Sequence, residues 1–144
     1  MLKNYLSLIK FSHTIFALPF ALIGFTLAVS QKEYAFTWDK LLFVLLCMIF
    51  ARSAAMAFNR YIDKDVDTAN PRTAKIREIP NGTIKAGSAL RFVIVNCMLF
   101  MGTAYLLNSL CFLLSPIALL VILGYSYTKR FTALCHLILG LGLS

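Results

Sequence analysis

The residues best suited to chemistry in this sequence lie in one polar stretch, residues 59–80, of an otherwise apolar chain. Asn59, Asp63 and Asp67 recur every four residues, which on an α-helix places them within an arc of roughly 80° on one face. Asp65 falls on another face. Aligned carboxylates repel one another unless a cation lies between them, and Mg²⁺ prefers oxygen ligands of this kind. The spacing therefore predicts a site for a hard cation.

Basic residues follow these acids closely in the sequence. Arg72, Lys75 and Arg77 all lie within ten residues of Asp67, and side chains of this charge pair with phosphate oxygens. Together the two sets favour a metal site with an anion, such as a diphosphate, bound beyond it. The spacing alone leaves one alternative open, which is a solvated, charged connector between two membrane helices.

The composition is that of a membrane protein. Of 144 residues, 60% are hydrophobic and 14% are charged, and the mean hydropathy of +0.78 is too high for a soluble domain of this size. The net charge is +8, but the basic residues lie between apolar segments, not in a stripe with aromatics. We therefore expect the lipid bilayer as a partner and no nucleic acid. The four cysteines fall inside apolar runs without a C-x-x-C pair, so we expect buried free thiols.

The apolar segments predict an all-α fold, a multi-pass transmembrane helix bundle. Residues 1–10 form an amphipathic lead-in at the membrane surface. Pro19 lies inside the first span and predicts a kink there, and Pro116 lies inside the fourth. Four full spans are expected, over residues 11–30, 41–58, 89–107 and 110–127.

The last segment, residues 131–144, is apolar but too short to cross a membrane. Its fourteen residues would make about 21 Å of helix against a hydrocarbon core of about 30 Å. We expect a truncated fifth span, so that the chain is the N-terminal part of a longer protein. A re-entrant or interfacial ending is the alternative.

One cation is expected at membrane depth. Arg52 precedes Asn59 by seven residues, which places it about 20° away on a helix and roughly 10 Å deeper. It either faces the site from below or extends its side chain to the interface.

The distribution of basic residues predicts the orientation in the membrane. Lysines and arginines concentrate in the first ten residues, between residues 60 and 91, and at Lys129 and Arg130. Such segments stay in the cytoplasm. We therefore expect the N-terminus and the aspartate-rich stretch on the cytoplasmic side of the inner membrane, where Lys129 can approach the acids.

Several motifs resemble those of the UbiA-type intramembrane prenyltransferases. N-R-Y-I-D-K-D-V-D at 59–67, N-P-R-T at 70–73 and R-E-I-P-N-G at 77–82 are similar to the first aspartate-rich motif of that family, N-x-x-x-D-x-x-x-D, and the loop after it. H-T-I-F-A-L-P-F-A at 13–21 and Y-S-Y-T-K-R-F-T at 125–132 resemble its branch of 4-hydroxybenzoate and menaquinone-pathway polyprenyltransferases. The resemblance covers the whole chain and about the first half of a typical member.

The resemblance implies a bundle of about nine transmembrane helices around a central cavity, with residues 1–144 as the N-terminal part of a single domain. Two aspartate-rich motifs would bind a polyprenyl diphosphate through Mg²⁺. Asn59, Asp63 and Asp67 would hold the metal, and Asp63, Asp67 and Lys129 would be catalytic. No acidic residue follows Glu78, so the second motif is missing. The residues that would contact or line the diphosphate are Lys10, Arg72, Arg77, Tyr125 and Lys129.

The residue types suit this chemistry without the resemblance. Mg²⁺ and basic side chains stabilise the charge that develops on a departing diphosphate. A small aromatic acceptor can then attack the allylic cation while the membrane bundle excludes water. The resemblance makes that acceptor a quinone precursor of ubiquinone or menaquinone biosynthesis.

Two other interpretations stay open at this point. A small transporter or channel subunit would spread its charges along a pathway across the membrane, whereas Arg52 is the one charge expected at depth. A catalytically inactive fragment of the same enzyme is the other.

Overall fold

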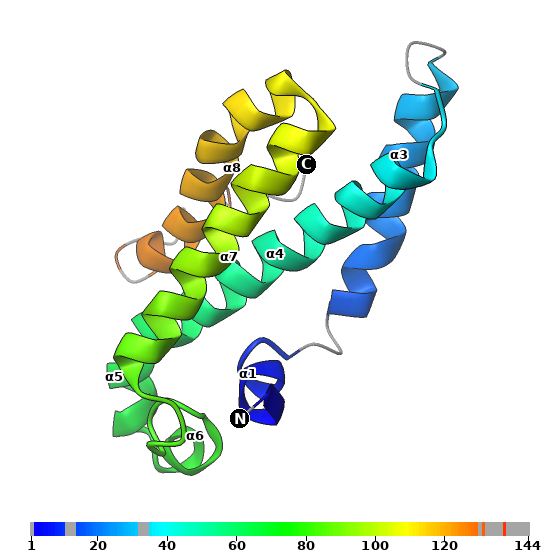
Figure 1. The fold of residues 1–144 in the computed structure, drawn as a ribbon. Coiled ribbons are helices and arrows are strands. Elements are labelled where there is room, and N and C mark those ends of the chain that lie inside the picture. Colours follow the sequence, from blue (N-terminus) through cyan, green and yellow to red (C-terminus); the bar gives the residue numbers. More distant parts are fainter. Residues whose placement is uncertain (1, 11–13, 32–34, 130, 132–136, 138–144) are drawn as a thin grey trace.

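The structure is a computed structural model that describes residues 2–10, 14–31, 35–129, 131 and 137. Every regular element in these ranges is a helix, and none of the described residues forms a strand (Figure 1). The all-α prediction is therefore confirmed.

Three long apolar helices form the body of the molecule. They are α4 (Trp38–Ile62), α7 (Ala86–Leu107) and α8 (Ser109–Thr128), and each is long and apolar enough to cross a membrane. The longest, α4, packs along α7, and α8 packs against both (Figure 1). Pro116 lies inside α8 as predicted. These helices correspond to the second, third and fourth expected spans.

The first expected span begins with a 3-10 turn in the described part of the chain. A 3-10 turn (η1, Ile15–Ala17) leads into α3 (Leu18–Ser30), and residues 11–13 lie outside the described part of the chain. Pro19 lies in the first turn of α3, directly after this 3-10 turn, where a proline N–H is not needed for the α-helical bonding of α3. Apart from Phe131 and Leu137, the expected fifth span also lies outside the described residues.

A tight turn reverses the chain between α7 and α8. Asn108 ends the first helix and caps the second, and its side-chain Oδ1 accepts a hydrogen bond from the N–H of Leu110 at 3.2 Å. A side-chain oxygen in this position satisfies a donor that the helix start leaves unpaired. The turn sends α8 back along α7 (Figure 1), so that its last residues return toward the end of α4.

Short helices gather at the opposite end from this turn. α1 (Leu2–Leu8), α5 (Lys64–Ala69) and α6 (Pro71–Ile76) lie together at the foot of the bundle in Figure 1. The buried core extends to this end, where apolar residues of α1 meet alanines of α4 and α7. The polar stretch identified from the sequence is therefore built on packed helices.

Candidate metal and diphosphate site

The aspartate-rich stretch is not one continuous helix. Asp63 caps the end of α4, and α5 begins at the next residue. The N–H of Asp63 still donates to the carbonyl of Asn59 at 3.0 Å, and the N–H of Asp67 to that of Asp63 at 2.8 Å. Helical connectivity thus continues across the break, while the two aspartate side chains meet different partners.

The first cluster joins α4 to α8. The ammonium Nζ of Lys129 donates to Oδ1 of Asn59 and, at 2.5 Å, to Oδ2 of Asp63. The side chains of Lys129 and Asp63 are 25% and 18% exposed, so bulk water screens this ion pair only in part. Two of the three predicted metal ligands therefore already hold a cationic group between them.

The second cluster closes within the polar stretch. Nη1 of Arg77 donates to Oδ2 of Asp67, whose side chain is only 8% exposed. The chain folds back through α6, since Oγ1 of Thr73 donates to the carbonyl of Asp67 at 2.8 Å and Oδ1 of Asn70 accepts from the N–H of Arg72 at 3.1 Å. This local capping returns Arg77 to the acid ten residues before it.

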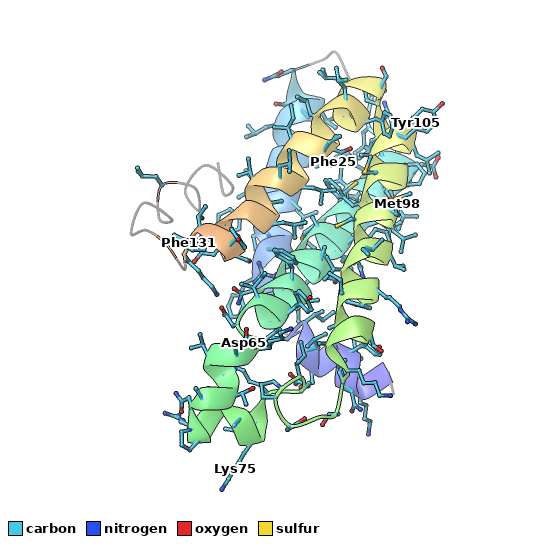
Figure 2. All side chains as sticks on the ribbon, turned by 90° about the vertical axis from the view of Figure 1, so that its left-hand side faces the viewer. Phe25, Asp65, Lys75, Met98, Tyr105 and Phe131 are labelled. Carbon is cyan, nitrogen blue, oxygen red and sulfur yellow. The ribbon has the colours of Figure 1, made fainter. Side chains whose placement is uncertain are left out.

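The other three predicted diphosphate residues make no such contacts. Lys10 and Arg72 are exposed and Tyr125 is half-buried, and none of the three side chains has a hydrogen bond or ion pair with another described residue. The carbonyl of Tyr125 accepts the N–H of Lys129 at 3.2 Å. The structure thus gathers Asn59, Asp63 and Lys129 in one cluster and pairs Asp67 with Arg77. Asp65 and Lys75 lie at the same end, on α5 and α6 (Figure 2).

Arg60 is a buried basic residue at the same end of the bundle, and the sequence predicts it only as part of the basic segment after the second span. It is 8% exposed in the last turn of α4, and its Nε has no hydrogen-bond partner among the described residues. Its charge interacts with those of Asp63, Asp67, Arg77 and Glu78. The signal was present in the sequence, because Arg60 precedes Asp67 by seven residues, or about 20° around a helix.

The donor set of the stretch fits Mg²⁺. Asn59, Asp63 and Asp67 offer one amide and two carboxyl groups, all oxygen donors of the kind that this hard cation prefers. Among the described residues, no three His, Cys, Asp or Glu side chains come close enough to form a metal-binding group. The stretch would therefore supply part of a coordination shell. Mg²⁺ ordinarily keeps several waters and completes its shell with substrate phosphates.

Comparison with known proteins identifies similar sequences over most of the chain. The sequence matches the model of the UbiA prenyltransferase family over residues 17–144. It is 35% identical over 107 residues to a 4-hydroxybenzoate octaprenyltransferase of Aliivibrio fischeri, covering 74% of this chain and 37% of that protein. It is also 38% identical over 89 residues to a protoheme IX farnesyltransferase of Bdellovibrio bacteriovorus, covering 62% of this chain and 30% of that protein.

The fold has a solved counterpart. The apo structure of a UbiA homolog from Aeropyrum pernix superposes with a TM-score of 0.80 at 37% identity, covering 92% of this chain and 46% of that one. The chain thus spans less than half the length of these proteins. Because the family model matches most of its residues, from 17 to 144, the chain belongs to the UbiA prenyltransferase family.

Proposed function

We propose that this chain binds a polyprenyl diphosphate through Mg²⁺ and takes part in transfer of the polyprenyl group to a small aromatic acceptor. The observation that carries the proposal is the pair of acid–base contacts at one end of the bundle, Lys129 with Asn59 and Asp63, and Arg77 with Asp67. Oxygen donors for a metal and basic donors for phosphate lie there in direct contact. A magnesium diphosphate complements both sets at once.

Each residue then has a role in the departure of the diphosphate. Asn59, Asp63 and Asp67 would hold Mg²⁺, which when bound stabilises the charge that develops on the leaving oxygen. Once these oxygens are occupied, Lys129 and Arg77 lose their present partners and can donate to phosphate oxygens, where charge-assisted hydrogen bonds are strong. The same two cations thus serve the empty and the loaded site.

The organic part of the reaction needs an apolar, water-free space. Departure of the diphosphate leaves a cation on the allylic carbon, which the face of an aromatic ring stabilises. Tyr125 lies one helical turn before Lys129, at the end of α8, and we assign this role to its ring. A bundle embedded in the lipid bilayer keeps water from capturing the cation.

Arg52 is our candidate for binding the acceptor. The Aliivibrio relative is named for 4-hydroxybenzoate, which carries a carboxylate. Arg52 is partly buried in α4, seven residues before Asn59, and its Nε has no hydrogen-bond partner among the described residues. A buried donor without a partner is costly. A carboxylate bound at Arg52 would satisfy it and would place the aromatic ring below the metal site.

The position of the charges favours an enzyme over a transport pathway. The acids of both ion pairs lie at one end of the bundle, since Asp63 caps the start of α5 and Asp67 lies in it, whereas a pathway would need charges along the membrane normal. The excess of basic residues at this end supports a cytoplasmic site in the inner membrane. We place the reaction in the biosynthesis of ubiquinone or menaquinone.

The proposal is tested with the intact protein in membranes. A polyprenyl diphosphate and 4-hydroxybenzoate are supplied with Mg²⁺ or with EDTA, and the prenylated product is identified by mass spectrometry. We expect product with Mg²⁺ and none with EDTA, because the acids alone repel the diphosphate. Transfer that persists in EDTA would remove the metal from the proposal. Absence of prenyl transfer to any aromatic acid tested would remove the acceptor class.

A further inference from the structure

The short first helix is anchored more deeply than its length suggests. Leu8 is 0% exposed and Ile9 is 5% exposed, although they end a helix of only seven residues. A helix this short does not hold together by itself, so its packing must fix it. Tyr5 adds a ring stacked on Phe92 of α7, with the ring centroids 5.1 Å apart. The buried residues that share a cluster with Leu8 and Ile9 are Ala54, Ala57, Ile84, Ala89 and Val93.

The same cluster holds the loop that follows Arg77. Ile84, at the end of this loop, belongs to the cluster and is 5% exposed. Ile79, in the middle of the loop, packs against the cluster. Oγ of Ser7 donates to Oε1 of Glu78, the residue directly after Arg77 and 71 residues from Ser7. The first helix thus contacts the loop both through its apolar core and through a hydrogen bond.

The loop itself is compact. The N–H of Asn81 donates to the carbonyl of Arg77 at 3.0 Å, and the N–H of Ile84 to that of Glu78 at 2.9 Å. These bonds tie the loop to itself and not to α4 or α5. The start of the loop is also held by α6, because the carbonyl of Thr73 accepts the N–H of Arg77 at 2.9 Å. The position of the rest of the loop relative to Asp67 depends on its contacts with α1 and on the Arg77 ion pair.

We propose that α1 with Ile9 is a latch that positions Arg77 beside Asp67 for diphosphate binding. This inference rests on the proposed function, in which Arg77 donates to phosphate. Ser7, Leu8 and Glu78 are positioning residues, since they act through Arg77 and not on the substrate. Releasing the latch lowers the fraction of molecules with Arg77 in place, and the apparent affinity for the ligand falls by the same factor.

Hydrogen exchange measures the latch without any ligand. In the intact protein in lipid nanodiscs, Ser7→Ala is expected to speed amide exchange at Asn81, Gly82 and Ile84, and Leu8→Ala to speed it further. Ser7→Thr keeps the hydroxyl and should exchange like the parent protein. The matched control is Ser30→Ala, because that hydroxyl bonds only the carbonyl of Leu27 in its own helix.

Calorimetry with Mg²⁺ and inorganic diphosphate measures the consequence for binding. The loss of one hydrogen bond should weaken binding by about 3- to 10-fold in Ser7→Ala, with recovery in Ser7→Thr and no change in Ser30→Ala. Recovery by threonine separates positioning from a general loss of stability.

Different results would overturn the latch and the proposed function. If Ser7→Ala matches Ser30→Ala in both exchange and affinity, the latch is overturned, and this holds even where Leu8→Ala does not fold. If the parent protein binds no magnesium diphosphate, the proposed function is overturned. Loop exchange then still decides whether α1 holds the loop.

Discussion

The two ends of this bundle use polar side chains in different ways. At the end with Asn108, polar groups bond to nearby backbone, as when Oγ1 of Thr26 donates to the carbonyl of Ile23 and Oγ of Ser30 to that of Leu27. At the other end, Lys129 reaches residues 66 and 70 positions away. Local bonds satisfy backbone groups within one helix, whereas long-range bonds between charged groups hold separate helices together. The comparison teaches that, in the described part of the chain, long-range contacts between charged groups mark the end where we propose the ligand binds.

The largest effect should follow from changing an acid at the site end. Asp63→Asn keeps the shape of the side chain and removes its charge, so we expect prenyl transfer to fall by at least about 100-fold through loss of Mg²⁺. The matched control is Asp39→Asn, an acid in the first turn of α4 at the other end. If the two variants have equal activity in an assay with saturating Mg²⁺, the acid at the site end has no special role in the reaction.

A smaller effect is expected at the base that faces this acid. Lys129→Gln removes a charge-assisted donor to the diphosphate, and we expect the affinity for magnesium diphosphate to fall by about 10- to 100-fold. Calorimetry compares it with Lys40→Gln, a lysine of α4 near the opposite end. If Lys129→Gln binds magnesium diphosphate as tightly as the parent, Lys129 bonds Asn59 and Asp63 but does not contact the diphosphate.

Arg52 sharpens the comparison along the length of α4. Arg52→Gln should raise the KM for the aromatic acceptor by about 10-fold and leave the KM for the polyprenyl diphosphate close to that of the parent. Arg91→Gln, an exposed arginine on α7, is the control. Equal rises in both KM values would instead indicate a general disturbance of the site.

The smallest effect should come from the capping turn. Asn108→Ala removes the acceptor for the N–H of Leu110, which should lower the free energy of unfolding by about 1 kcal/mol. Thermal unfolding in detergent measures this change, and prenyl transfer at a temperature below the transition should not change. A large loss of activity would mean that the turn contributes to the site.

Much of the fold follows from local patterns. The lengths of the apolar runs predict α4, α7 and α8, and the polar pair at 108 and 109 predicts the turn between them. That turn and the alternation of spans also bring Lys129 back to the acids. The 3-10 turn before Pro19 was not predicted, because a proline in an apolar run fits a helix start as well as a kink.

Pairings between distant segments were not predictable in the same way. The spacing of Asn59, Asp63 and Asp67 identifies the stretch as a candidate site. It does not show that Asp63 pairs with one basic side chain and Asp67 with another, on either side of the boundary between α4 and α5. The burial of Arg60 and the bond between Ser7 and Glu78 depend on how α1 and the loop pack. No periodicity within one segment encodes such contacts.

The lysine held by Asn59 and Asp63 has a consequence for how the site fills. Under the proposed function, Lys129 would compete with the metal for these oxygens, at the high effective concentration of a tethered group. When Mg²⁺ binds alone, it must displace the Lys129 ammonium, which then has no acceptor in the site. Mg²⁺ arriving with a diphosphate supplies that acceptor, so the two should bind with positive cooperativity. Under the proposed function, the empty site should bind free Mg²⁺ weakly and bind it tightly together with the diphosphate.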